Sequence, residues 1–126
     1  MAAVLDSSAV LAMLFKEPGA RLVASKISDA AISTVNLAEV VSKLIDEGFA
    51  PAEARRTAQS IPMQVHLFDT ESAVQTGLLR AATRAHGLSL GDRACLALAA
   101  RLEAEAVTAD RAWSGADIGV DIRLIR

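Results

Sequence analysis

A predicted strand gives way to a predicted helix within the seven residues Val4-Leu5-Asp6-Ser7-Ser8-Ala9-Val10. The run Ala2–Leu5 is short and wholly apolar, which is typical of a strand buried on both faces. Ser7 and Ser8 then offer caps for a helix over Ala9–Phe15. A buried strand followed at once by a helix indicates an α/β fold.

The same alternation continues along the chain. Further strands are predicted at Ala30–Ser33, Gln64–Phe68, Ala106–Thr108 and Val120–Ile125. Helical spacing of apolar residues predicts helices around Leu22–Ile27 and over Thr34–Glu47, Ala52–Ser60, Asp69–His86 and Gly91–Glu103, with a turn or short helix at Arg111–Ser114. Strands separated by helices predict a mostly parallel sheet with helices on both faces, a three-layer α/β/α sandwich. No repeat or linker interrupts the pattern, so residues 1–126 are expected to form one domain.

Composition is consistent with this fold. The 126 residues are 52% hydrophobic and 22% charged, which suits one compact core with an ordinary charged surface. We recognise no signal peptide and no apolar stretch long enough to cross a membrane, so a cytoplasmic protein is expected. The one cysteine, Cys95, cannot form an intramolecular disulfide and is expected to be a buried apolar residue. Neither His66 nor His86 shows zinc-ligand spacing with it.

Four acidic residues stand where such a sheet would place a site. Asp6 and Asp110 follow predicted strands, whereas Glu39 and Asp92 begin predicted helices. Ligands bind open parallel sheets beyond the carboxyl ends of the strands, so the four carboxylates are expected to converge on one cleft. Carboxylates at close range repel one another unless a cation intervenes, and an all-oxygen ligand set suits Mg²⁺ or Mn²⁺. Such an ion can activate water and neutralise charge on a phosphate.

Each acid also has a purely structural explanation. Asp6 and Asp110 would cap the helix or turn that follows them. The segments Asn36–Glu39 and Ser89–Asp92 have capping-box spacing, in which the acid bonds back to the first residue of the box. Capping and metal binding are compatible, because a capping carboxylate is already held in place.

Four segments that carry these acids resemble the motifs of PIN-domain nucleases, in the same order along nearly the whole chain. They are Val4–Val10, Ser33–Val40, Leu88–Ala99 and Val107–Trp113. The resemblance is closest to the VapC-like toxins of bacterial toxin–antitoxin pairs. It implies an α/β/α sandwich around a parallel sheet, and a Mg²⁺- or Mn²⁺-dependent endoribonuclease. One departure is Ala112, at a position that is acidic in some relatives.

The resemblance also implies roles for individual side chains. The implied catalytic and metal-binding acids are Asp6, Glu39, Asp92 and Asp110. Ser7 and Thr108 would be supporting hydroxyls near the metal, and Asn36 would orient Glu39 or touch the substrate.

Expected partners follow mostly from the same resemblance. VapC-like toxins usually dimerise and are neutralised by a small antitoxin whose tail covers the acidic cleft, so an RNA substrate, a cognate antitoxin and a homodimer are expected. The apolar faces of Ala9–Phe15 and Thr34–Ile45 would add a partner surface or simply pack in the core. Arg93 and Arg111 directly follow site acids, so they are candidates for RNA contacts, with ordinary surface charge as the alternative.

Other function classes fit less well or stay open. A receiver-like domain needs a neighbouring acid pair early in the chain and a late Lys, yet no Lys lies beyond Lys43. A dinucleotide-binding domain needs a Gly-rich turn after the first strand, which is absent. A PIN-fold RNA-processing nuclease without an antitoxin and a catalytically silent PIN-fold binding module remain as alternatives.

Overall fold

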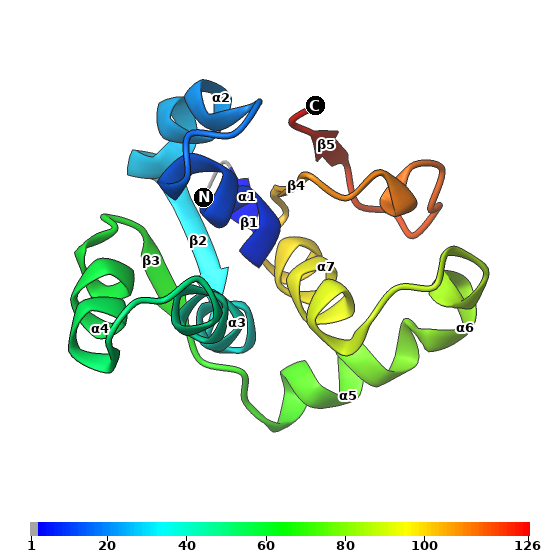
Figure 1. Ribbon diagram of the computed structural model, residues 1–126. Helices are drawn as coiled ribbons and strands as arrows, with labels where there is room; N and C mark the ends of the chain where they lie inside the picture. The colour runs from blue at the N-terminus through cyan, green and yellow to red at the C-terminus, as the bar shows by residue number, and fades with distance from the viewer. Residues whose placement is uncertain (1–2) are drawn as a thin grey trace.

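The computed structural model describes residues 3–126 and contains a five-stranded sheet in the order β3-β2-β1-β4-β5 (Figure 1). The strands are β1 (Ala3–Leu5), β2 (Ala30–Ser33), β3 (Gln64–His66), β4 (Glu105–Thr108) and β5 (Ile122–Leu124). Every neighbouring pair is parallel, which confirms the predicted sheet. Ala2, the first residue of the first predicted strand, lies outside the described residues.

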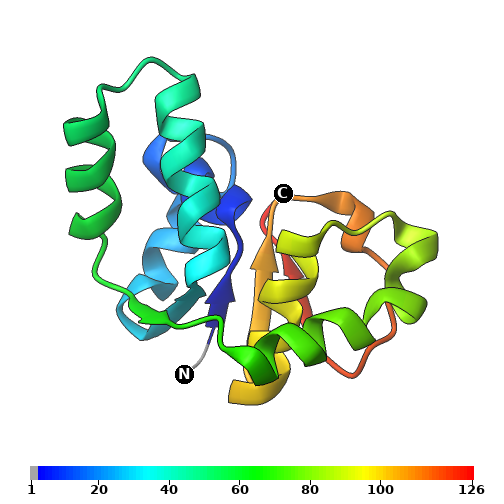
Figure 2. The same ribbon diagram turned by 90° about the horizontal axis from the view of Figure 1, so that it is seen from below.

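Helices cover both faces of the sheet, so the predicted three-layer sandwich is confirmed. The helices are α1 (Ser7–Leu14), α2 (Ala20–Lys26), α3 (Thr34–Asp46), α4 (Pro51–Ser60), α5 (Thr70–Leu78), α6 (Arg80–Thr83) and α7 (Leu90–Leu102), with short 3₁₀ turns η1 (Ile27–Asp29), η2 (Arg84–His86) and η3 (Arg111–Trp113). Figure 2 shows α1 to α4 on one side of the strands and α5 to α7 on the other. Across residues 3–126, no helix has the length and apolar character needed to cross a membrane.

The core divides along the two faces of the sheet, as the alternation of side chains in a strand requires. Ala3 and Leu5 of β1 pack with apolar residues of α1 to α4, whereas Val4 packs with α7 and Trp113. Every residue of β1 and β2 is buried, because these central strands are covered on both faces. The short apolar runs seen in the sequence are therefore the centre of the sheet.

The single helix predicted over Asp69–His86 is wrong, because the segment is broken at Leu79 into α5, α6 and η2. In an unbroken helix the Thr76 carbonyl would accept the Arg80 amide. Instead the Arg93 guanidinium donates from Nη1 to the Thr76 carbonyl over 3.1 Å. A side chain inserted into a helical hydrogen-bond ladder is a recognised cause of such breaks, and this one comes from a residue distant in sequence.

Candidate active site

The order of the strands places a switch point between β1 and β4. The chain moves outward from β1 through β2 and β3, then crosses to β4 and β5 on the other side. Ligand sites of open α/β sheets lie at the carboxyl ends of the strands that flank such a point. Asp6 directly follows β1, and its amide donates to the Val107 carbonyl of β4 over 3.2 Å. The fold thus brings Asp6 to the end of β4, just before Asp110.

Asp6 is a buried carboxylate held by neutral donors, with only 3% of its surface exposed. Thr108 Oγ1 donates to Asp6 Oδ2 over 2.6 Å, and the Ala9 amide donates to Oδ1 over 2.9 Å. Burial raises the pKa of Asp6 to about 6; the hydrogen bonds from Thr108 and Ala9 oppose that rise, and the nearby charge of Asp92 adds to it. The bond from Ala9 confirms that Asp6 caps the first helix, in place of Ser7 or Ser8.

The hydroxyl that contacts Asp6 from α1 belongs to Ser8. Ser8 Oγ lies 2.7 Å from Asp6 Oδ1 and 2.9 Å from Oδ2, and it accepts the Ala109 amide over 2.9 Å. Among the described residues, Ser7 makes no side-chain hydrogen bond to Asp6. Sequence reasoning missed Ser8, although its position two residues after a capping acid is the signal that would have identified it.

Asp92 lies in the first turn of α7, where the predicted capping box is confirmed. The Ser89 amide donates to Asp92 Oδ2 over 2.8 Å, and the Asp92 amide donates to Ser89 Oγ over 3.1 Å. The carboxylate is thereby fixed through one oxygen, Oδ2. Its charge is close enough to Asp6 to raise the pKa of that carboxyl.

Asp110 caps the short turn η3, as predicted. Its Oδ1 accepts the Ala112 amide over 2.9 Å, and its own amide donates to Thr108 Oγ1 over 3.0 Å. Thr108 Oγ1 therefore contacts both Asp6 and Asp110. The side chain of Asp110 is more exposed than that of Asp6, so it lies at the open rim of the site.

The capping role predicted for Glu39 is wrong, because α3 begins earlier than the capping box required. Ser33 is the cap of α3, and its hydroxyl accepts the Val35 amide over 3.2 Å. Glu39 Oε1 instead accepts a hydrogen bond of 2.8 Å from the side chain of buried Asn36. The same Asn36 amide group donates to the Gly91 carbonyl of α7 over 3.0 Å, so it joins Glu39 to α7.

Three of the acids lie close enough to one buried thiol for their charges to act on it. The pKa of Cys95 is raised well above its ordinary value by burial and by the charges of Asp6, Asp92 and Glu39. The burial of Cys95, expected from the sequence, is thus confirmed. The three acids are near neighbours and not a closed cage: within residues 3–126, no three Asp, Glu, His or Cys side chains stand close enough to hold one metal ion.

The two arginines that follow site acids differ in their surroundings. Arg93 is half-buried, with Nη1 bonded to the Thr76 carbonyl and Nε buried without a partner among the described residues. Arg111 is exposed and forms no ion pair within residues 3–126.

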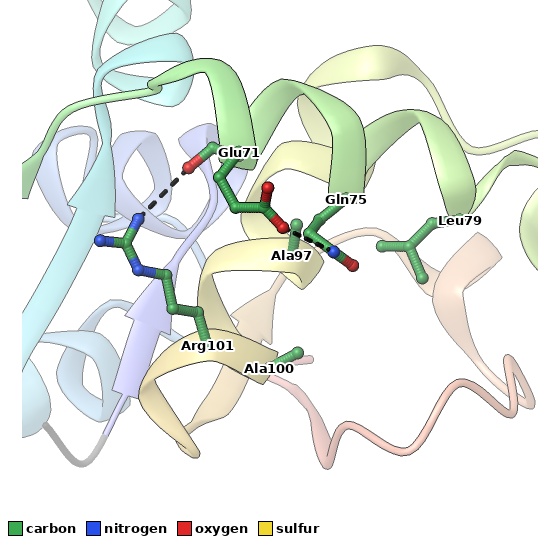
Figure 3. Close-up of a pocket in the computed structure, with 7 residues that line it drawn as sticks. Glu71, Gln75, Leu79, Ala97, Ala100 and Arg101 are labelled. Carbon is green, nitrogen blue, oxygen red and sulfur yellow. Dashed lines mark hydrogen bonds between the residues drawn. The ribbon is translucent and has the colours of Figure 1, made fainter.

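A surface pocket of about 450 Å³ lies elsewhere, between α5 and α7 (Figure 3). Its lining residues are Glu71, Ser72, Gln75, Leu79, Ala97, Ala100 and Arg101. Figure 3 shows Ala97 and Ala100 of α7 opposite Gln75 of α5 and Leu79, the residue that follows α5, with Arg101 reaching toward the start of α5. None of the predicted site residues lines this pocket.

Comparison with solved structures gives the same fold as the toxin–antitoxin proteins. The DNA-bound VapBC structure from Salmonella typhimurium matches with a TM-score of 0.77 and 21% identity, covering 100% of this chain and 99% of that one. A toxin–antitoxin complex from Klebsiella pneumoniae matches with a TM-score of 0.72 and 19% identity, over 90% and 92% of the two chains. VapC20 of Mycobacterium tuberculosis, described as a sarcin–ricin loop cleaving toxin, matches with a TM-score of 0.72 and 16% identity, over 95% and 99%.

Comparison at the level of sequence gives the family. No curated protein matches the chain. The family model of the PIN domain, however, matches residues 3–118, which include all four acids and both arginines that follow them. By its sequence, and in agreement with its parallel sheet and the acids at the switch point, the chain belongs to the PIN domain family.

Proposed function

We propose that this protein is a metal-dependent endoribonuclease that hydrolyses RNA phosphodiester bonds as the toxin of a toxin–antitoxin pair. The observation that carries the proposal is the buried Asp6 carboxylate at the switch point of a PIN fold, with the charge of Asp92 beside it. A buried carboxylate next to a second acid is costly unless a cation or a proton neutralises it. Such a pair is therefore a suitable place for a divalent ion.

The side chains fit Mg²⁺ or Mn²⁺, since every donor in the set is an oxygen. Within residues 3–126, Asp6 has no Lys, Arg or His partner, so its charge is left for a cation to balance. Asp6 and Asp92 would hold one ion with Asp110 close by, and Glu39 would position the attacking water or share a second ion. When bound, the ion would lower the pKa of a water molecule and neutralise charge that develops on the phosphate.

The chain's own residues would orient the reacting groups. Thr108, Ser8 and the Ala9 amide fix both oxygens of Asp6, so this ligand is held in place before substrate arrives. Asn36 fixes Oε1 of Glu39, which leaves Oε2 to position the attacking water and accept its proton. Ser7 makes no side-chain hydrogen bond to Asp6 among the described residues, so its supporting role would not involve direct contact with this ligand.

RNA as the substrate class rests on the PIN family and on a structural neighbour, VapC20, which is described as cleaving the sarcin–ricin loop. Exposed Arg111 next to Asp110 supports a contact with the RNA backbone, since guanidinium groups pair well with phosphate. Arg93 is already engaged by Thr76, which favours a structural role for that arginine.

An antitoxin and a homodimer are proposed as protein partners. Structural neighbours described as VapBC and as a toxin–antitoxin complex support the antitoxin. The helices predicted to offer a partner surface mostly pack in the core, since Ala9, Val10, Val40 and Leu44 are fully buried. Large apolar side chains are exposed near the end of α3, on and near β3, on α5 and at the start of α7: Ile45, Val65, Leu67, Val74, Leu78 and Leu90. Light scattering at high concentration tests the dimer, and a strict monomer would contradict it.

Cleavage assays test the enzyme. Purified protein should cut RNA with Mg²⁺ or Mn²⁺ and lose the activity in EDTA. Asp6→Asn and Asp92→Asn should abolish it while the circular dichroism spectrum stays unchanged. Equal activity with and without EDTA would overturn the metal dependence, and a fully active Asp6→Asn would overturn the site. RNA binding without cleavage would favour the silent binding module, and cleavage without an antitoxin gene nearby would favour an RNA-processing nuclease.

A further inference from the structure

We infer that Gly91 is a positioning residue, whose lack of a side chain lets the Glu39 carboxylate lie against the first turn of α7. A Cβ built on Gly91 would overlap Glu39 Oε2, and it would stand only 2.7 Å from Cδ and 2.8 Å from Oε1. Real Cβ atoms essentially never approach another heavy atom so closely. The space that a methyl group would occupy is therefore already filled by the carboxylate of Glu39.

Within residues 3–126, the backbone conformation does not explain why position 91 is a glycine. Gly91 is the second residue of α7 and has none of the positive φ values that make glycine necessary elsewhere in the chain. Glycine weakens a helix relative to alanine, because it loses more conformational freedom on folding. The helix thus carries an unfavourable residue at a position where the Glu39 carboxylate lies against its backbone.

Asn36 bridges the same carboxylate and the backbone of Gly91. Its buried side-chain amide donates to Glu39 Oε1 over 2.8 Å and to the Gly91 carbonyl over 3.0 Å. The amino end of α7 also carries the positive end of the helix dipole, which favours a negative charge placed against it. Asn36 therefore holds the Glu39 carboxylate by a hydrogen bond, the amino end of α7 attracts its charge, and Gly91 leaves room for it because it has no side chain.

A methyl group at position 91 should therefore move Glu39 away from α7 and break its bond with Asn36. The expected effect on RNA cleavage rests on the proposed nuclease function, because the position of Glu39 affects cleavage only if the protein is a nuclease. The effect on the position and energetics of Glu39 does not depend on that function. The two can be measured separately.

The test compares Gly91→Ala with Gly77→Ala, a matched change in α5. A Cβ on Gly77 would meet nothing within 4 Å, so that substitution should raise the melting temperature, as alanine in an open helix does. Gly91→Ala should lack this gain, because the flexible end of Glu39 must shift and its bond with Asn36 is lost. In a Glu39→Ala background the carboxylate that blocks a methyl group at position 91 is absent. Gly91→Ala should then raise the melting temperature as Gly77→Ala does.

Two further measurements follow Glu39 itself. The ¹³C carboxyl resonance of Glu39 should shift in Gly91→Ala and stay in place in Gly77→Ala. With RNA and Mn²⁺, kcat of Gly91→Ala should fall by roughly 100-fold while KM changes little, since a displacement of about 1 Å costs this much in a positioned active site. Gly77→Ala should cleave like the unsubstituted protein.

The outcomes separate the two proposals. A Gly91→Ala variant with a raised melting temperature and an unmoved Glu39 resonance would overturn the positioning role. The same would follow if Gly91→Ala lowered the melting temperature equally with and without Glu39. If the unsubstituted protein cleaves no RNA, the nuclease proposal fails, whereas the melting temperatures and the resonance still decide the role of Gly91.

Discussion

Thr108 Oγ1 donates a hydrogen bond of 2.6 Å to Asp6 Oδ2 across 102 positions of sequence. The same oxygen accepts the Asp110 amide over 3.0 Å. One buried hydroxyl therefore joins the end of β1 to the end of β4 and connects two of the acids on which the proposed site depends. Asp6 has its place at the switch point partly because of this bond.

Thr108→Val should destabilise the fold and raise the pKa of Asp6 further. Valine keeps the shape of threonine but removes a donor to a buried carboxylate, a loss of roughly 1.5–3 kcal/mol. Because the bond from Thr108 lowers the pKa of Asp6, its removal should move that pKa above about 6. Urea unfolding and ¹³C titration of the Asp6 carboxyl measure the two effects. Thr108→Ser, which keeps the hydroxyl, is the control, and a Thr108→Val variant with the original pKa would contradict the prediction.

In EDTA, the contribution of Asp6 to the free energy of unfolding should become less favourable as pH rises from about 4 to about 7. The pKa of Asp6 is raised from 3.8 when unfolded to about 6 when folded, so the folded state binds more protons in this window. Ionising Asp6 then opposes folding by up to about 3 kcal/mol above pH 6. Below pH 4 both states are protonated and the penalty disappears.

Asp6→Asn isolates this contribution, because asparagine keeps the shape and removes the charge. The variant should be more stable than the unsubstituted protein at pH 8, and the gain should shrink toward pH 4.5. Urea unfolding in EDTA at both pH values measures it, with exposed Asp117→Asn as the control. The prediction would be contradicted if the stability gained by Asp6→Asn over the unsubstituted protein were smaller at pH 8 than at pH 4.5.

The sequence was informative wherever a local signal decides the structure. Short apolar runs predict β1, β2 and β4 because strands buried on both faces are nearly continuous apolar runs, with polar residues only at the ends of β2 and β4. Capping spacing predicts the contacts of Asp6, Asp92 and Asp110 because each acid bonds an amide within three residues. Parallel strands, whose carboxyl ends share one edge, also predict that Asp6 and Asp110 lie near each other, and Thr108 contacts both.

The features that the sequence did not predict depend on contacts between segments that are distant along the chain. The break at Leu79 follows from Arg93 reaching the Thr76 carbonyl, 17 residues away in sequence. The contact between Glu39 and Gly91 joins two helices, and only the packed structure shows that a side chain at position 91 would collide with it. Capping-box spacing assigned Glu39 to the start of a helix, although the helix predicted over Thr34–Glu47 already begins before Asn36, as α3 does.

Gly19→Ala should destabilise the protein more than Gly48→Ala, although both glycines have a left-handed backbone. Their φ angles are +96° and +98°, so each substitution should carry a strain of about 1–2 kcal/mol. A Cβ on Gly19 would also stand 2.7 Å from Cγ1 and from the carbonyl oxygen of Ile125, whereas one on Gly48 would meet nothing within 4 Å. We expect this overlap to add about 1–3 kcal/mol to the loss in Gly19→Ala. Urea unfolding of both variants measures the difference, and equal losses would mean that the Ile125 contact relaxes freely.

Arg93 and Arg111 should separate into a structural arginine and an RNA-binding one. Arg93→Met removes the donor to the Thr76 carbonyl in the α5–α7 contact, so it should lower stability by about 1 kcal/mol. Arg111→Gln changes an exposed side chain, so stability should stay within about 0.5 kcal/mol. Its effect should fall on RNA binding, since loss of one phosphate contact reduces the slope of log K against log salt by about 1.

Anisotropy of a labelled RNA over a salt series measures this slope, in an Asp6→Asn background that prevents cleavage. Urea unfolding of the same proteins gives the stabilities. Arg111→Gln should flatten the salt dependence and Arg93→Met should leave it unchanged. The prediction would be contradicted if Arg93→Met flattened the salt dependence and kept the stability of the unsubstituted protein. The Arg93 guanidinium would then bind phosphate instead of the Thr76 carbonyl, and Arg93 would belong to the RNA-binding surface.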